Sequence, residues 1–251
     1  METIIVYVVR TPMRIAAAQP LTRSHDVEGN AARHADAVRA AAARVVVFPE
    51  MSLTGYELTA APLEPDDPRL APLRAACAET GTLALAGAPV PGPRIGVLAV
   101  DADGVRVAYR KMFLGGAEPR HMRPGREPAV LDVDGWRLGL AVCKDTGTPE
   151  HAAATVALGA DAYLAGVLES ADDAAVPDGR ARRVAATHRV WVVTASFAGS
   201  TGGGYTRAAG GSGIWSPAGE PVIRAGADAG EVVTAICGDG QPSSAPPRSR
   251  S

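Results

Sequence analysis

The chain has 251 residues, of which 47% are hydrophobic, 21% charged and only 4% aromatic. These proportions exclude a wholly disordered, collagenous or disulfide-scaffold protein, and the net charge of −2 without a block of like charges argues against a nucleic-acid partner. The apolar run near the start, residues 4–9, is far shorter than the ~18 residues of a membrane span, so we expect no membrane association.

Both ends of the chain differ from the region between them. Residues 1–12 end at a proline and have no periodic partner, so we expect an N-terminal extension with Met13 as an alternative start. Residues 238–251 are dominated by Gly, Pro, Ser and Arg, which predicts a disordered tail. The folded domain is therefore expected at 13–237.

Within this domain, short apolar runs alternate with amphipathic patterns. The pattern predicts strands at 13–19, 45–48, 82–87, 95–101, 105–111, 128–133, 136–143, 161–167, 190–196, 211–216, 221–226 and 231–236, and helices at 27–43, 68–80, 149–158 and 177–187. Asp103-Gly104 and Asp134-Gly135 each separate two apolar runs, which is the strongest short signal of a β-hairpin. Helices that alternate with strands and hairpins predict an α/β domain with mixed sheets and outer helices.

Motifs of the common cofactor and metal enzymes are absent from the sequence. It contains no G-x-x-x-x-G-K-[ST], G-x-G-x-x-G, H-E-x-x-H, C-x-x-C or G-x-S-x-G, and its five histidines are scattered. We therefore expect neither a cofactor nor a metal site. Three widely spaced cysteines cannot all pair, which favours a reducing cytoplasmic location.

Three reactive side chains come at the ends of apolar runs. Glu50 follows VVVFP, Lys111 ends VRVAYRK, and Cys143 ends WRLGLAVC. Each has a simpler explanation, namely a solvated loop acid, a lysine protecting an edge strand, and a buried structural thiol. However, ligands of open α/β sheets gather at such strand ends, and a following helix would favour a cysteine thiolate.

Lysine is rare in this chain, because 23 of the 25 cationic residues are arginine and only Lys111 and Lys144 are lysine. An ammonium is a compact charge that fits beside a tetrahedral intermediate, whereas a guanidinium is broad and planar. A thiol, a carboxylate and an ammonium are what nucleophilic hydrolysis of an amide requires: Cys143 to attack, Glu50 to move protons and Lys111 to hold the oxyanion.

The segments VVFPEMSLTGYEL (46–58), YRKMFLGGAEPRHMRPG (109–125) and WRLGLAVCKDTGTPEHAAATVALGADAYL (136–164) resemble, in order and spacing, the three signature regions of the carbon-nitrogen hydrolase (nitrilase) superfamily. The resemblance extends over about 13–237 and implies a four-layer αββα sandwich of two mixed sheets. It also implies a Glu-Lys-Cys triad at Glu50, Lys111 and Cys143, and a second glutamate, at Glu118, that orients the lysine. Further substrate-binding or supporting positions within the resembling segments are Tyr56, Lys144, Asp145 and Ser196.

Two of these positions differ from the usual family pattern. Similar proteins usually carry an aromatic residue directly after the cysteine, where this chain has Lys144, and often an asparagine where it has Ser196. Lys144 could lower the pKa of the neighbouring thiol, bind a substrate carboxylate, or simply be solvated. Its backbone amide would join the oxyanion hole by analogy.

The resemblance implies a cofactor-free hydrolase of non-peptide C–N bonds that acts on a small-molecule substrate through a cysteine thioester. Linear amides, ω-amides and N-carbamoyl compounds are all candidate substrates. The alternatives are nitrile hydrolysis by the same triad, a Ser-Ser-Lys amidase based on the glycine-rich stretch 208–215, and a small-molecule-binding relative without catalysis. A homodimer or larger homo-oligomer is implied by resemblance alone.

Overall fold

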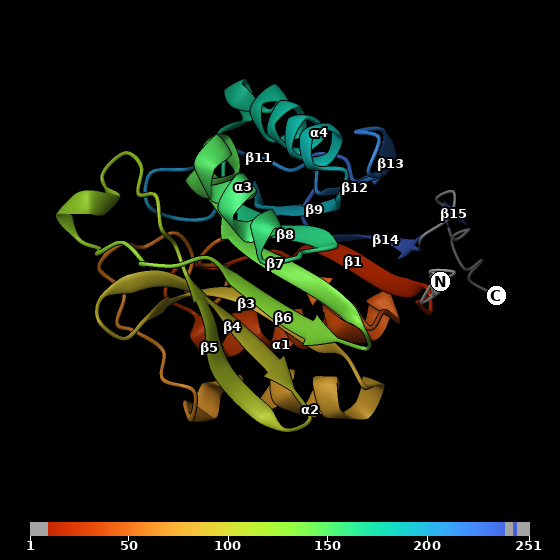
Figure 1. Cartoon of the computed structure of the whole chain (residues 1–251). Coiled ribbons are helices and arrows are strands. Elements are labelled where there is room, and N and C mark those ends of the chain that lie inside the picture. Colours follow the sequence, from red (N-terminus) through yellow and green to blue (C-terminus); the bar gives the residue numbers. More distant parts are fainter. Residues whose placement is uncertain (1–9, 239–242, 245–251) are drawn as a thin grey trace, which may run out of the picture.

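The computed structural model describes residues 10–238 and 243–244 (Figure 1). Most of the predicted N-terminal extension and of the predicted C-terminal tail lies outside the described residues. Two residues of the predicted tail, Ser243–Ser244, form the short strand β15 and pair with β14. In the part of the chain that the structure describes, no helix is long and apolar enough to cross a membrane.

The first sheet has the strand order β15-β14-β1-β2-β3-β4-β5. Besides β15, this sheet consists of β1 (Met13–Gln19), β2 (Val45–Val47), β3 (Leu83–Val90), β4 (Arg94–Asp101), β5 (Gly104–Arg110) and β14 (Glu231–Cys237). β1, β2 and β3 run parallel, whereas β4 and β5 follow as antiparallel neighbours. Because two antiparallel steps restore the direction, β5 ends at the same edge of the sheet as β2.

The second sheet has the order β13-β12-β9-β8-β7-β6. Its strands are β6 (Ala129–Val133), β7 (Trp136–Val142), β8 (Ala162–Val167), β9 (Trp191–Ser196), β12 (Gly213–Trp215) and β13 (Pro221–Arg224). Again three central strands, β7, β8 and β9, run parallel. Two short strands, β10 (Ala198–Gly199) and β11 (Ala208–Ala209), pair outside both large sheets and were not predicted.

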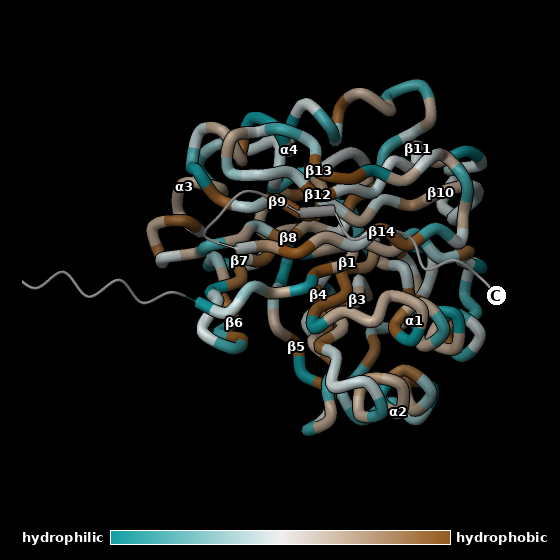
Figure 2. Tube along the Cα trace, turned by 90° about the vertical axis from the view of Figure 1, so that its right-hand side faces the viewer, coloured by the Kyte–Doolittle hydropathy of each residue, from teal (hydrophilic) through white to brown (hydrophobic). Residues whose placement is uncertain are grey.

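The two sheets pack face to face, with helices on both outer surfaces (Figure 1). Alternation along β1 shows why: Ile15 and Ala17 lie in the core between the sheets, whereas Ala16 and Ala18 pack under α1 (Val27–Ala41) and α2 (Ala71–Thr80). The second sheet is covered by α3 (Pro149–Ala157) and α4 (Ala175–His188). The predicted four-layer αββα sandwich is confirmed, and Figure 2 shows its hydrophobic strands between more hydrophilic loops.

Local chemistry explains where the elements begin and end. Asp26 caps α1 by accepting a hydrogen bond from the Gly29 amide, and Gly81 ends α2 in the left-handed conformation that glycine adopts easily. The first helix stops at Ala41, two residues before its predicted end, because Ala42 has a positive φ of 44°. Asp134 and Gly135 both have positive φ, as a two-residue hairpin between β6 and β7 requires.

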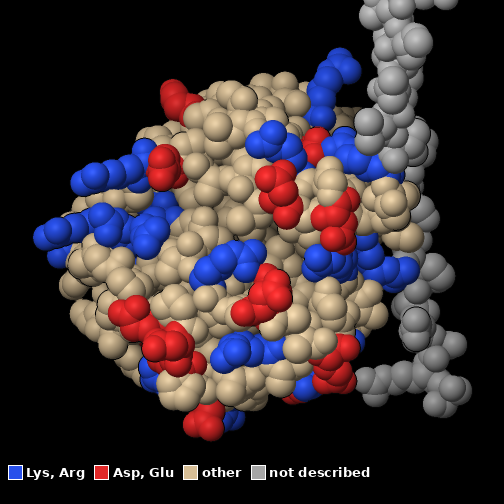
Figure 3. Space-filling model, turned by 60° about the horizontal axis from the view of Figure 1, so that its bottom comes forward, with Lys and Arg blue, Asp and Glu red and all other residues tan. Residues whose placement is uncertain are grey.

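The surface carries charges of both signs side by side. On the face shown in Figure 3, acidic and basic side chains are interspersed, without a broad area of one sign. Several of these charges form ion pairs, such as Arg106 with Asp101 and Arg39 with Glu79.

Candidate active site

Glu50 is positioned by a loop that passes between the two sheets. It follows β2, after Pro49, and its side chain is only 1% exposed. A Cβ atom added to Gly166 of β8 would lie 2.5 Å from the Phe48 carbonyl oxygen and 2.8 Å from the Glu50 nitrogen, and one added to Gly87 of β3 would collide with the same loop. Glycine on each sheet therefore makes the space that brings this carboxylate inside the sandwich.

Cys143 is the first residue after β7 and begins the short 3-10 helix η3 (Cys143–Gly147). Its backbone has a positive φ of 44°, a conformation that is strained for a residue other than glycine. The thiol donates a hydrogen bond to the Leu168 carbonyl at 3.4 Å and remains half-buried. The turn thus holds the sulfur at the cavity floor near the end of β8.

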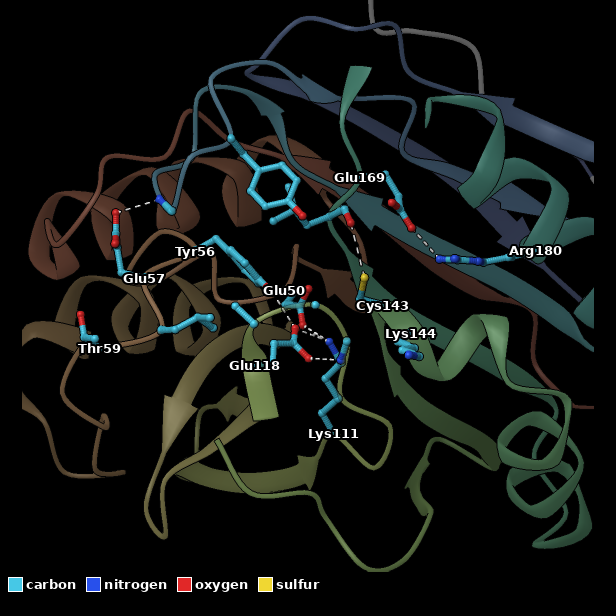
Figure 4. A pocket seen from close by; sticks show the side chains of 17 residues that line it. Glu50, Tyr56, Glu57, Thr59, Lys111, Glu118, Cys143, Lys144, Glu169 and Arg180 are labelled. Atoms are coloured by element: carbon cyan, nitrogen blue, oxygen red, sulfur yellow. Dashed lines mark hydrogen bonds and ion pairs between the residues drawn. The ribbon is translucent and has the colours of Figure 1, made fainter. Parts of the chain in front are cut away.

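Lys111 follows β5 and lies at the centre of the polar cluster. Its Nζ donates to Oε1 of Glu50 at 2.6 Å and to Oε1 of Glu118 at 2.7 Å, and its side chain is 1% exposed. Its backbone is fixed on both sides, because its amide donates to the Ile95 carbonyl and its carbonyl accepts from the Gly125 amide. Figure 4 shows the ammonium between the two carboxylates, beside the cysteine.

Glu118 is held by three donors on three segments of the chain. Besides Lys111, the Tyr56 hydroxyl donates to its Oε1 at 2.7 Å and the Gly115 amide donates to its Oε2 at 2.8 Å. The side chain is 2% exposed, so Glu118 is a buried acid and not an exposed loop residue. The sequence-predicted residues Glu50, Tyr56, Lys111, Glu118 and Cys143 all line one cavity.

Burial and neighbouring charges set the protonation of this cluster. Burial raises the pKa of Glu50 to about 7; the Lys111 ammonium opposes this shift and the Glu118 carboxylate adds to it. One oxygen of Glu50, Oε2, has no hydrogen-bond partner among the described residues. Burial lowers the pKa of Lys111, but the carboxylates of Glu50 and Glu118 outweigh this effect and raise it.

The surroundings of the Cys143 thiol oppose its ionisation. Burial raises its pKa, the Glu50 carboxylate raises it further, and Lys111 acts in the opposite direction. The expectation that a following helix would favour the thiolate is therefore wrong for the resting state, because η3 is a single short 3-10 turn and desolvation dominates. The thiol needs a base to be activated.

Asp145 supports the site from behind. Its carboxylate accepts hydrogen bonds from the Val142 and Phe113 amides and from the Tyr109 hydroxyl, at 2.8 to 2.9 Å. Burial raises the pKa of Asp145, and the three donors hold the carboxylate in place. Because the Tyr109 hydroxyl gives its one proton to Asp145, Nε2 of His151 donates to that hydroxyl, at 2.7 Å. This buried network connects the turn that carries Cys143 to the loop between Lys111 and Glu118.

The two unusual positions differ in their surroundings. Lys144 is exposed and lines the cavity. Ser196 is completely buried at the end of β9, where its amide donates to the Ser212 hydroxyl and its own hydroxyl to the Phe197 carbonyl. Ser196 does not line the cavity. Of the two predicted roles, substrate binding or support, its hydrogen bonds fit only support, at the end of β9.

The charged and aromatic cavity-lining residues that the sequence analysis missed are Glu57, Glu169, Arg180 and Tyr205. Glu169 comes two residues after β8 and forms an ion pair of 2.6 Å with Arg180 of α4. The rule that identified Cys143, a reactive side chain at the end of a parallel strand, would also have found Glu169. Nothing local marks Arg180 or Tyr205, which reach the cavity only through the tertiary fold.

Comparisons with known proteins agree with this geometry. The family model described as carbon-nitrogen hydrolase matches residues 14–237. The protein called "Hydrolase in pqqF 5'region" of Pseudomonas protegens is 34% identical over 229 residues, which cover 86% of this chain and 80% of that protein.

Solved structures of an amidase from Nesterenkonia are also similar. A mutant of this nitrilase-superfamily amidase has a TM-score of 0.82 and 27% identity, covering 93% of this chain and 94% of that one. Another mutant has a TM-score of 0.80 and 27% identity, covering 90% of this chain and 91% of that one. In that second structure, the acetamide moiety of fluoroacetamide is covalently added at the active-site cysteine.

Proposed function

Because the chain belongs to the carbon-nitrogen hydrolase family, we propose that it hydrolyses the C–N bond of a small-molecule amide through a thioester on Cys143. One observation carries this proposal: a buried ammonium, Lys111, bridges two carboxylates beside a thiol at the floor of the cavity. The acetamide adduct on the cysteine of the Nesterenkonia amidase supports the same assignment.

In the first half of the reaction the Cys143 sulfur attacks the amide carbon. The thiol proton passes to Glu50, an S–C bond forms, and the carbonyl oxygen becomes an oxyanion held by the Lys111 ammonium and the Lys144 backbone amide. When the tetrahedral intermediate collapses, the C–N bond breaks and Glu50 returns the proton to the leaving nitrogen. Ammonia or an amine departs and a thioester remains.

In the second half a water molecule attacks the thioester carbon. Glu50, again ionised, takes one proton from this water, and the resulting tetrahedral intermediate expels the sulfur, which regains the proton as a thiol. The balance is one amide and one water converted to one acid and one ammonia or amine. A pKa of about 7 suits Glu50 to both directions of proton transfer near neutral pH.

The test is an ammonia-release screen over linear amides, ω-amides and N-carbamoyl compounds, with nitriles as a comparison. We expect turnover by the natural protein, none by Cys143→Ala, and an acyl adduct on the natural protein by intact mass. Comparable turnover by Cys143→Ala would overturn the assignment. Acid and ammonia from nitriles but not from amides would favour the nitrile alternative, and no adduct with any substrate would favour a binding protein.

A further inference from the structure

The charges that line the cavity are paired, with one exception. Lys111 is bound by Glu50 and Glu118, and Arg180 is bound by Glu169 at 2.6 Å. Lys144 lines the same cavity, and within the described part of the chain no carboxylate lies within ion-pair distance of its ammonium. A positive charge at the cavity wall is therefore available to a ligand.

The remaining acid at the wall, Glu57, already has its own donors. The Ser24 hydroxyl and the Gly203 amide both donate to its Oε1, and His25 lies 3.8 Å from its Oε2. Glu57 also lies well away from Lys144 in Figure 4. The unpaired charge at the wall is thus positive.

The aliphatic part of the Lys144 side chain packs against the loop that precedes Glu118. A Cβ atom added to Gly115 would lie 3.2 Å from the Cδ atom of Lys144, so the aliphatic stem of Lys144 passes close to this glycine. Gly115 is also the residue whose amide holds Glu118. The ammonium is consequently held beside the loop that carries the catalytic cluster, one residue from the nucleophile (Figure 4).

The cavity has room for more than a bare carboxamide. Its volume is about 560 Å³, and Cys143 and Lys144 both line it. Taking the ~30 Å³ of a water molecule as a scale, a carboxamide group fills a small fraction of this space. A substrate that carries a further group besides its carboxamide therefore fits this cavity.

We propose that the Lys144 ammonium binds an acidic group of the substrate, so that the preferred substrates are small amides that also carry a carboxylate. Cys143 and Lys144 are consecutive in the chain, and consecutive Cα atoms are about 3.8 Å apart, so a small amide bound at the sulfur can also lie close to Lys144. This inference rests on the proposed amidase function and specifies its substrate class.

The test compares monoamides of short dicarboxylic acids with neutral amides of the same chain length. The natural protein is expected to show higher kcat/KM for the acidic member of each pair. In Lys144→Gln the acidic-to-neutral ratio falls by about tenfold or more, the size of one lost charge-assisted hydrogen bond. Lys144→Glu lowers the ratio further and shifts the preference towards amides that carry an amine.

Arg74→Gln is the matched control, because it removes one exposed positive charge from the outer helix α2 and should leave the ratio unchanged.

A second readout does not need turnover. Cys143→Ala should bind the acidic amide more tightly than the neutral one, and added salt should reduce this difference in affinity. The inference would be overturned if the acidic-to-neutral ratio of kcat/KM were equal in the natural protein and in Lys144→Gln and if binding of the acidic amide did not depend on salt. Cys143-dependent turnover in the same experiment would leave the amidase assignment intact, so the two failures are distinguishable.

Discussion

The Lys111 ammonium lies 2.6 Å from Oε1 of Glu50, and each of the two side chains is only 1% exposed. A pair of charges removed from water in this way is stable only when both partners are satisfied. Glu118 provides a second acceptor for the ammonium, whereas Oε2 of Glu50 has no partner among the described residues. One carboxylate oxygen is therefore available for the protons of the reaction.

Replacing Lys111 by Arg should lower kcat by at least ~10²-fold, the scale of one lost oxyanion donor. The charge is kept, but a planar guanidinium does not fit the space of an ammonium between two carboxylates. Stopped assays for ammonia, with circular dichroism to establish that the variant is folded, measure this effect. An unchanged kcat would remove Lys111 from the oxyanion site.

The pH dependence should follow Glu50. Burial raises its pKa to about 7, and Glu50 must be ionised to accept the thiol proton, so kcat/KM should rise between about pH 6 and 8 and then level off. Because the Glu118 charge contributes to the raised pKa, Glu118→Gln should move the rise to lower pH, even with a lower maximum rate. A rise that stays at the same pH in this variant would contradict the assignment.

Tyr56→Phe should lower kcat about tenfold while KM changes little. The ring that packs edge-on against Tyr205, with centroids 5.4 Å apart, is kept, but the hydrogen bond to Glu118 is lost. A hydrogen bond to a charged group has this order of effect. The opposite pattern, a raised KM with the same kcat, would show that Tyr56 contacts the substrate rather than positioning Glu118.

Gly166→Ala should lower both thermal stability and activity. Its new Cβ would lie 2.5 Å from the Phe48 carbonyl oxygen, so the loop of Glu50 must move, at a cost of about 1–3 kcal/mol in the free energy of unfolding. Gly179→Ala in α4 is the control, because a Cβ there meets nothing within 4 Å and alanine favours a helix. Comparable melting temperatures for the two variants would contradict this account.

Much of the fold was predictable because its signals are local. Apolar runs located every strand of the two large sheets except β15, and the two Asp-Gly turns predicted the hairpins β4–β5 and β6–β7. Strand ends also predicted Glu50, Lys111 and Cys143, since reactive side chains at one edge of parallel strands must meet. The short pair β10–β11 has two residues per strand, too few for any periodic signal.

The environment of the site was not predictable in the same way. The raised pKa of Cys143 depends on how much of the thiol the opposite sheet covers, and the partner of Glu169 comes from a helix eleven residues further along. Ser196 is the opposite case, a strand-end residue that was predicted for the site but does not reach the cavity. It ends β9, yet its hydroxyl donates to the Phe197 carbonyl. Only the packed molecule determines these features.

The nucleophile belongs to one sheet and its partners to the other, because Cys143 follows β7 whereas Glu50 and Lys111 follow β2 and β5. An acyl group bonded to the sulfur, with its oxygen bound to the Lys111 ammonium, therefore connects the two middle layers of the sandwich. Under the proposed mechanism, each catalytic cycle would make and break this connection between the two sheets. The candidate active site therefore depends on the two sheets remaining packed against each other.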